Sequence, residues 1–396
     1  MKQLITNSVF IKLTISSILQ SAGVWIRNMT LLFFVMDLTG GNPLAVSMLT
    51  VVQYAPIFIF SIVGGVLADR WRPKATMIYG ELFSFLSILL IMAGIRTGYW
   101  QAVFVTGAIS SIVSQFSQPS AAKIIKQHVP EELISTAMAV SQTQKSLFLI
   151  GGPALGTAFY NGFGLEVSIG SLLILFLLSA LCLSFLPKSV YEERRDRSSF
   201  SSEFTEGFRY LQKNRDLGVF LIIFALVALG EGLLKPVEIF LVRDRLQLPV
   251  ENVQWLTGSM GLGMLAGGIC AGIFVRSISG NKGVIYSLFL LGGLTMIEVW
   301  SIWPWLTGFV RFLMGIAIAL VQTFLSSFML TAVEGAYIGR MNGMISPVFT
   351  GSLLIGSSVS GMFLNATSLF FVYVTAGFIF LIAAFFSFNI QSIKER

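Results

Sequence analysis

The chain has 396 residues, of which 55% are hydrophobic and only 11% are charged, and its formal net charge is +7. Soluble proteins carry about 25% charged residues, and a water-soluble fold could not bury so large an apolar share. The composition therefore excludes a soluble globular protein and indicates a chain whose main solvent is lipid.

Apolar segments long enough to cross a bilayer, which takes about 20 residues, follow one another along the chain. Before a polar segment they lie near 9–36, 44–68, 75–95, 100–122, 133–160 and 165–186; after it they lie near 217–240, 253–275, 283–303, 305–328, 340–363 and 368–390. The first segment is longer than the core of a signal peptide and carries Lys12, Gln20 and Arg27, so we expect it to be retained as a helix. The predicted fold class is an all-α integral membrane protein with 12 transmembrane helices. Its predicted parts are an N-terminal six-helix bundle at 1–186, a cytoplasmic linker at 187–216 and a C-terminal six-helix bundle at 217–396.

Lys and Arg are distributed unevenly between the loops that join these segments. With the N-terminus inside, the outer loops hold only Arg96, Arg243 and Arg245, and all the other loop cations fall on the inner side. Positive residues favour the cytoplasmic side, so we expect a multi-pass protein of the cell membrane with both termini cytoplasmic. This bias explains the basic net charge, and no nucleic acid partner is expected.

Residues typical of cofactor or catalytic sites are scarce in the sequence. Cys182 and Cys270 both lie inside apolar segments, and His128 lies in a charged loop, which favours neither a disulfide framework nor a metal site. The sequence contains no P-loop motif and no visible Ser/His/Asp set. We therefore expect neither an enzyme nor an ATP-driven pump, and no cofactor.

The two halves of the chain share weak internal similarity. An offset of about 207 residues places Asn7 on Asn214 and Gly23 on Gly230, at positions where the helix boundaries also repeat. Glycines also concentrate in the second, fifth, eighth and eleventh segments, the fifth of which contains Gly152, Pro153 and Gly156. Small residues let helices pack closely in lipid. Their regular recurrence favours an interface that moves between the two halves, with ordinary tight packing as the alternative.

The loop between the second and third segments reads GGVLADRWRPK, residues 64–74. It resembles the loop motif of the major facilitator superfamily, and the matching residues are Gly65, Leu67, Ala68, Asp69, Arg70 and Lys74. Arg72 stands where the motif has glycine, and Pro73 where it has arginine. The resemblance implies two pseudo-symmetric six-helix bundles and a cytoplasmic conformational latch formed by Gly65, Asp69, Arg70 and Lys74.

Two further stretches narrow the resemblance. Residues 116–140 look like the corresponding region of the drug:proton antiporter-3 branch, which includes macrolide and siderophore exporters. Residues 151–156, GGPALG, are similar to a glycine-proline motif of many antiporters. An arginine that many drug–proton antiporters carry on their fourth helix is absent, because residues 100–122 contain no arginine.

Ionisable residues within spans are costly and are functional candidates by default. Glu231 and Lys235 lie four residues apart on one helix face; they either neutralise each other or leave Glu231 free to exchange a proton during transport. Glu81 lies near the cytoplasmic face, where Arg70 or Arg72 could hold it in a structural role. Glu231 is the first proton-coupling candidate and Glu81 the second. Asp37 and Glu298 lie near outer boundaries, where we expect them to reach the lipid headgroups.

The resemblance implies that the first, fourth, seventh and tenth helices line a central cavity. The substrate-cavity candidates on them are Gln20, Arg27, Asn28, Gln115, Gln118, Glu231, Lys235, Arg311 and Gln322. The three cations among these residues outnumber the single acid, which predicts a substrate with a carboxylate or another anionic group.

These features together predict a secondary active transporter that works by alternating access. We expect proton-coupled efflux of a small amphipathic compound, such as an antibiotic, a peptide-like metabolite or a siderophore, by a monomer in the lipid bilayer. Two alternatives stay open on the same scaffold: a lipid or glycolipid flippase, and a proton-coupled uptake symporter.

Overall fold

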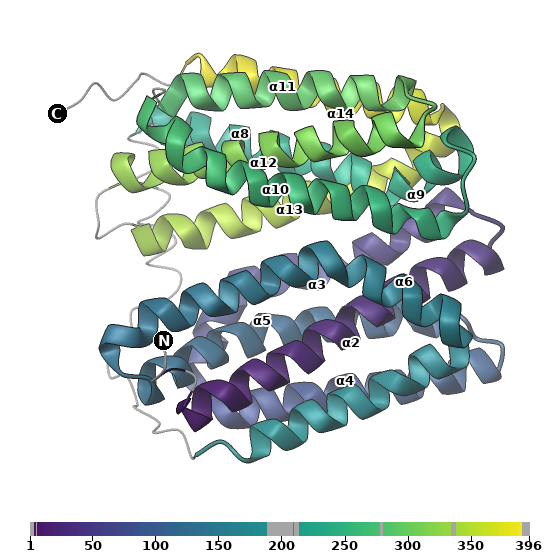
Figure 1. Ribbon diagram of the computed structural model, residues 1–396, viewed down its shortest axis with the longest axis vertical. Coiled ribbons are helices and arrows are strands. Elements are labelled where there is room, and N and C mark those ends of the chain that lie inside the picture. Colours follow the sequence, from purple (N-terminus) through teal and green to yellow (C-terminus); the bar gives the residue numbers. More distant parts are fainter. Residues whose placement is uncertain are drawn as a thin grey trace. The chain divides into compact units, whose positions relative to one another are not determined.

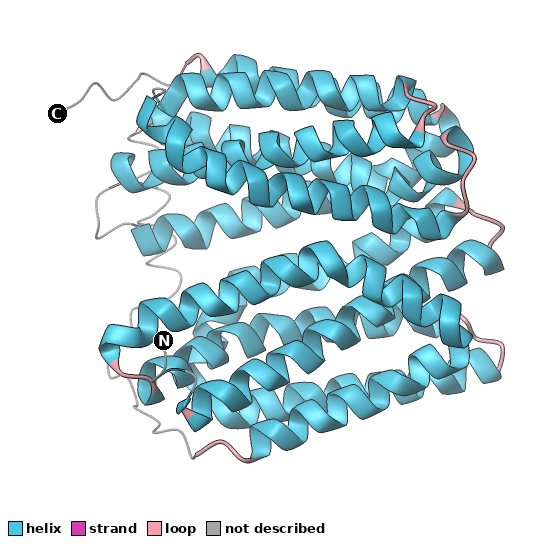
Figure 2. Cartoon of the chain, in the orientation of Figure 1, coloured by secondary structure: helices cyan, strands magenta, loops and turns pink. Residues whose placement is uncertain are grey.

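A computed structural model describes residues 4, 6–187, 209, 214–277, 280–333 and 338–389. All regular secondary structure in these residues is helical, as Figure 2 shows. The chain divides into two compact units, Met1–Gly40 with Val52–Arg197 and Gly41–Val51 with Ser198–Arg396. Most of the predicted linker at 187–216 lies outside the described residues, so the predicted domain limits stay a prediction.

The helices of the first half follow the predicted segments closely. They are α2 (Ser8–Leu38), α3 (Pro43–Arg70), α4 (Pro73–Arg96), α5 (Ala102–His128) and α6 (Glu131–Ser184) (Figure 1). The long α6 contains two predicted spans, and Gly164, with φ of 72°, interrupts its helical backbone between them. Only glycine adopts this left-handed conformation without strain, so Gly164 marks the division between the two spans.

The second half begins with α8 (Arg215–Leu234), which continues through short irregular turns. These are the 3₁₀ turn η1 (Lys235–Val237), the single turn α9 (Glu238–Phe240), the π turn η2 (Leu241–Arg245) and the 3₁₀ turn η3 (Val250–Asn252). The remaining helices are α10 (Val253–Ser277), α11 (Gly280–Trp300), α12 (Pro304–Ala332), α13 (Ile338–Ala366) and α14 (Leu369–Ser387). Each predicted span of this half therefore corresponds to a helix.

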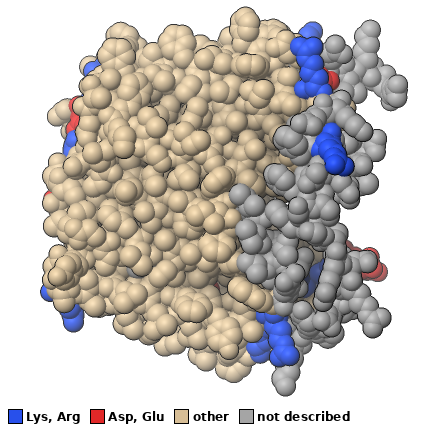
Figure 3. Space-filling view, turned by 180° about the vertical axis from the view of Figure 1, so that it is seen from behind, with Lys and Arg blue, Asp and Glu red and all other residues tan. Residues whose placement is uncertain are grey.

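The described surface suits a lipid environment. Nine stretches of the described residues are long and apolar enough to cross a membrane, with α6 counted once. Figure 3 shows a broad face without charged side chains, with Lys, Arg, Asp and Glu at its margins. Large apolar side chains such as Ile269 and Phe385 are mostly exposed on the helices. In water such a surface would be unfavourable, whereas lipid chains solvate it.

The internal repeat extends to the packing of the helices. In the first unit Gly23 of α2 faces Phe176 of α6, and a Cβ on Gly23 would lie 3.1 Å from the phenylalanine ring. In the second unit Gly230 of α8 faces Phe380 of α14, and a Cβ on Gly230 would lie 2.5 Å from that phenylalanine ring. Equivalent glycines thus accept equivalent phenylalanine rings, which supports the pseudo-symmetry of the two bundles.

Gly152 and Gly156 lie against a helix of their own unit. A Cβ on Gly152 would lie 2.4 Å from the Trp25 ring of α2, and a Cβ on Gly156 would lie 2.5 Å from the Trp25 carbonyl oxygen. Pro153 is buried between them. Glycine at both positions therefore permits the close approach of α6 to α2, and the predicted role of Gly152, Pro153 and Gly156 at an interface between the halves stays a prediction.

Glycines in the second unit show the same arrangement. A Cβ on Gly263 of α10 would lie 1.9 Å from the Phe312 carbonyl oxygen of α12, and a Cβ on Gly356 of α13 would lie 2.4 Å from the Leu229 carbonyl oxygen of α8. Tight packing within each unit, the alternative left open by the sequence, accounts for these glycines. Gly65 lies where the side chains and their surroundings are not described.

Candidate functional site

A buried cluster of charged side chains lies inside the second unit. Arg311 of α12 donates from Nε to Glu298 of α11, and from Nη1 to Glu238 of α9 at 2.9 Å. Its Nη2 donates to the Tyr373 hydroxyl of α14 at 3.3 Å. Side-chain exposure is 0% for Glu298, 5% for Arg311 and 17% for Glu238. We call Arg311, Glu238, Glu298 and Tyr373 the Arg311 cluster.

The polar atoms of the Arg311 cluster are satisfied unequally. Glu238 Oε1 accepts from Arg311 and also from the Thr257 hydroxyl of α10 at 3.2 Å. Glu298 Oε1 accepts from Arg311, whereas Glu298 Oε2 is buried without a hydrogen-bond partner among the described residues. A buried acceptor without a partner is unfavourable, so this atom is the feature of the cluster that needs a chemical explanation.

The prediction that Glu298 reaches the lipid headgroups is wrong. Its side chain is fully buried, because it turns toward Arg311 across the short connection between α11 and α12. The sequence could have indicated this pair, because Glu298 and Arg311 carry opposite charges on two consecutive helices that a short turn connects. Asp37, predicted in the same way, is exposed and accepts from the Tyr160 hydroxyl at 3.3 Å.

This pairing also corrects the cationic surplus expected in the cavity. Arg311 pairs with Glu238 and Glu298, two carboxyl groups that are not among the predicted cavity residues. The cations of the second unit's spans therefore do not outnumber its acids. The argument for an anionic substrate loses its main support.

Glu231 and Lys235 lie where the helix of α8 is interrupted. Glu231 is partly buried near the end of α8, and Lys235 begins η1 and acts on Glu231 electrostatically. Pro236, the next residue, has no N–H to donate to the carbonyl of Gly232. The helical hydrogen bonding of α8 is therefore interrupted about one turn after Glu231, the first proton-coupling candidate.

Serines of α13 compensate for this break. Ser357 Oγ donates to the Gly232 carbonyl oxygen at 3.1 Å, and Ser360 Oγ donates to the Leu233 carbonyl oxygen at 2.6 Å. Within a membrane, backbone groups released from a helix must find partners in neighbouring helices. The two serines thus allow α8 to deviate from helical geometry beside Glu231.

Glu81, the second proton-coupling candidate, is buried inside the first unit. Its exposure is 2%, and its Oε1 accepts from Gln20 Nε2 of α2 at 2.9 Å. Ser179 of α6 also interacts with the carboxyl group, and Oε2 has no hydrogen-bond partner among the described residues. Arg72 is exposed to solvent, so the partner expected from the loop is replaced by an amide and a hydroxyl. Arg70 lies where side chains are not described.

Arg27 is the buried cation of the first unit. Its exposure is 3%, and its Nη2 donates to Asn28 Oδ1 at 2.9 Å. Its Nη1 is buried without a hydrogen-bond partner in the described part of the chain. Arg27 and Asn28 therefore form a local pair within α2.

The remaining cavity candidates lie at the surface of their units. Gln118 of α5 is exposed and accepts from Lys145 Nζ of α6 at 3.1 Å. Gln115 is half-buried on α5, and Gln322 is exposed on α12. Their place in a substrate cavity stays a prediction.

Lys74 of the loop motif contacts α6 in its own unit. Its Nζ donates to the Ser184 carbonyl oxygen at 2.7 Å and to the Leu186 carbonyl oxygen. These carbonyls lie at the end of α6, where helices favour a cation. Lys74 therefore connects α4 to α6, whereas the side chains of Asp69 and Arg70 lie outside the described ones and their latch role is untested.

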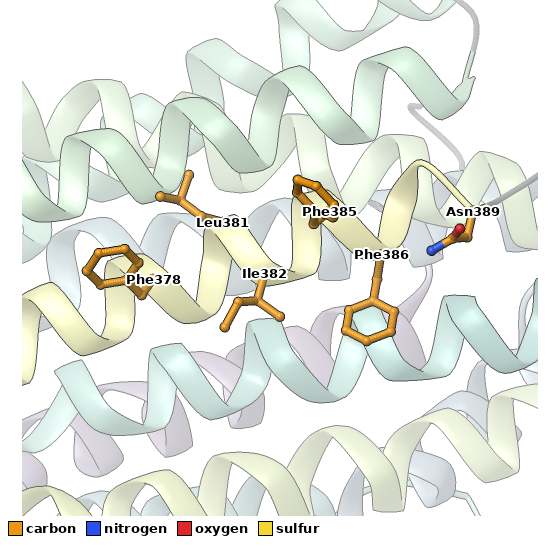
Figure 4. Close-up of a pocket in the computed structure, with 6 residues that line it drawn as sticks. All are labelled: Phe378, Leu381, Ile382, Phe385, Phe386 and Asn389. Atoms are coloured by element: carbon orange, nitrogen blue, oxygen red, sulfur yellow. The ribbon is translucent and has the colours of Figure 1, made fainter.

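A groove of about 460 Å³ runs along α14 and is shown in Figure 4. Its lining residues are Phe378, Leu381, Ile382, Phe385, Phe386 and Asn389. Because all of them come from α14 and the connected turn and only the last is polar, the groove lacks the charges that a proton or a polar substrate would need.

The family follows from the sequence of the first half together with the fold. Residues 13–234 match the sequence profile of the Major Facilitator Superfamily. The chain belongs to this superfamily. Its members are membrane transporters and not enzymes, which confirms the predicted family, the fold class and the absence of an enzymatic role.

Similar proteins support the same conclusion. The chain is 25% identical over 370 residues to the uncharacterised MFS-type transporter YkuC of Bacillus subtilis, covering 88% of this chain and 84% of that protein. It is 22% identical over 348 residues to macrolide efflux protein A of Streptococcus pyogenes, covering 85% of each. Among solved structures, the nucleoside transporter NupG superposes with a TM-score of 0.78 at 16% identity, covering 98% of this chain and 100% of that one. This chain is thus a multi-pass transporter of the superfamily.

Proposed function

We propose that this transporter exports a small amphipathic compound in exchange for protons, by alternating access, as a monomer in the cell membrane with both termini cytoplasmic. The observation that carries the proposal is the presence of carboxyl groups inside spans of both units, with Glu81 2% exposed and Glu231 partly buried. Carboxyl groups in such places are typical of proton pathways. The similarity to macrolide efflux protein A supports export and an amphipathic cargo.

The two units offer different roles for these carboxyl groups. Glu231 lies beside the interrupted end of α8, where movement of the backbone changes its distance to Lys235. Glu81 is held by Gln20 within the packed first unit. Glu231 therefore stays the first candidate for the coupling proton and Glu81 the second.

Reconstitution into liposomes with an imposed pH gradient tests the proposal. The probes are erythromycin, ethidium and a hydroxamate siderophore, each followed with and without the gradient. We expect gradient-driven transport of at least one probe by the wild type, and loss of that transport in Glu231→Gln. If no probe responds to the pH gradient, proton-coupled export of this class of compound is contradicted.

The matched control is Glu166→Gln, which makes the same chemical change at an exposed position. It should transport like the wild type. If the pH gradient still drives transport of the probe by the Glu231→Gln variant, Glu231 is not part of the coupling mechanism. Glu81 is then the candidate to test next.

A further inference from the structure

We propose that the Arg311 cluster holds one exchangeable proton. The observation is one of charge balance: two carboxyl groups, Glu238 and Glu298, are paired with the single guanidinium of Arg311. If both carboxyl groups were ionised, the buried cluster would carry one uncompensated negative charge. Such a charge is unfavourable away from water, and binding of one proton brings the cluster to neutrality.

Among the described residues, Arg311 is the cation that pairs with Glu238 and Glu298. Lys235, on the same helical path as Glu238, acts on Glu231 one turn earlier. Arg245, the last residue of η2, is half-exposed. Its Nη2 donates to the carbonyl oxygen of Trp300, the last residue of α11, at 3.0 Å. The neighbouring groups of α10 are the hydroxyl of Thr257 and the sulfur of Met260, and α14 contributes the hydroxyl of Tyr373. The described neighbours therefore leave the cluster with one acid more than it has bases.

The geometry also indicates where the proton is held. Glu238 is the more exposed carboxyl group, and it accepts from both Arg311 and Thr257, which suits an ionised group. Glu298 is fully buried, and its Oε2 has no partner among the described residues. A proton on Glu298 Oε2 makes this carboxyl group neutral while Oε1 still accepts from Arg311.

A purely structural ion pair would have a different composition. Buried pairs are retained when each charge is compensated and its hydrogen-bonding atoms are used. Here the second acid is unnecessary for such a pair, since Arg311 and either glutamate would already be neutral. The second carboxyl group gives the cluster a place for one proton, whichever of the two glutamates carries it.

Infrared spectroscopy of the full-length protein in liposomes tests this proposal without any substrate. A protonated carboxyl group has a C=O stretch that is distinct from that of a carboxylate. In the difference between wild type and Glu298→Gln at neutral pH, we expect the band of one protonated carboxyl group. Gln has nearly the same shape and retains the oxygen that accepts from Arg311, so this variant should remain folded.

A second variant tests the charge balance itself. In Glu238→Gln, Arg311 and Glu298 alone form a neutral pair, so Glu298 should ionise and the same band should be lost although Glu298 is still present. Glu166→Gln, at an exposed position, should leave the band unchanged. A wild-type spectrum identical in this region to that of Glu298→Gln would overturn the proposal, and so would retention of the band in Glu238→Gln.

That this proton is a coupling proton rests on the proposed function. With the probe that the wild type transports, we expect Glu298→Gln to lose the response of transport to a pH gradient. A gradient response equal to that of the wild type would remove the coupling role. Failure of the wild type to transport any probe would instead contradict the proposed function, and the infrared result would decide the proton site separately.

Discussion

The interruption of α8 at Pro236 makes a quantitative prediction about a hydrogen bond between helices. Because Pro236 has no N–H, the Gly232 carbonyl depends on Ser357 Oγ of α13, 3.1 Å away. Hydrogen bonds between membrane helices contribute about 0.6 kcal/mol on average and at most about 1.7 kcal/mol. We expect Ser357→Ala to lower the free energy of unfolding by more than this average, at about 1 kcal/mol, because the Gly232 carbonyl lacks a helical donor as well.

Restoring that helical donor should make Ser357 less important. In a Pro236→Ala background the new N–H can donate to Gly232, so Ser357→Ala should cost less than half as much. The coupling between the two substitutions is then about 0.5 kcal/mol or more, which a double-mutant cycle resolves. Ser358→Ala is the matched control: Ser358 is exposed and donates to Leu354 of its own helix at 2.8 Å, so its cost should be small and equal in both backgrounds.

Unfolding of the purified protein in mixed micelles by added SDS gives these free energies. A thiol-reactive fluorogenic dye supplies an independent thermal measurement, because Cys182 and Cys270 are free and lie partly buried within helices. An equal cost of Ser357→Ala with and without Pro236 would refute the reasoning, since it would show that the serine does not replace the missing N–H.

Three further predictions use the same assays. Gly263→Ala should destabilise the protein by about 1–3 kcal/mol, because its Cβ would lie 1.9 Å from a backbone oxygen of α12; Gly268→Ala on the same helix has open space and should be neutral or stabilising. Equal effects of these two substitutions would contradict close packing of α10 on α12. Lys74→Gln should lower the thermal midpoint by removing its contacts with the end of α6, whereas Lys74→Arg should retain most of the stability. Gln20→Leu should cost about 1–3 kcal/mol by removing the donor to Glu81, and this cost should disappear in a Glu81→Leu background if that hydrogen bond is its cause.

The helices could be predicted from the sequence because one physical rule dominates in lipid. Apolar runs of sufficient length must form helices there, since each backbone group has to be satisfied within its own segment. Boundaries such as Pro73 at the start of α4 and Gly164 within α6 follow from the same local chemistry. Glu81 and Glu231 could be recognised as candidates because an ionisable residue stands out in an apolar run.

Partners of side chains were harder to predict, because they depend on how helices face one another. The sequence placed Glu298 near a boundary and paired Glu81 with the cations of a nearby loop. In the folded chain Glu298 meets Arg311, and Glu81 meets Gln20 from a helix about 60 residues earlier. Rotation of a helix about its own axis decides such contacts, and an apolar run surrounded by lipid carries little information about that rotation.

Membrane insertion, the helix boundaries, the repeat and the family were therefore determined by the sequence alone, since they depend on hydropathy, on the distribution of charge and on motifs that are continuous in the chain. Only the tertiary structure decided that Gly152 and Gly156 pack against Trp25 and that two glutamates share one arginine. The physical reason is that these contacts join residues from different helices. Their free energy exists only when the helices are packed together.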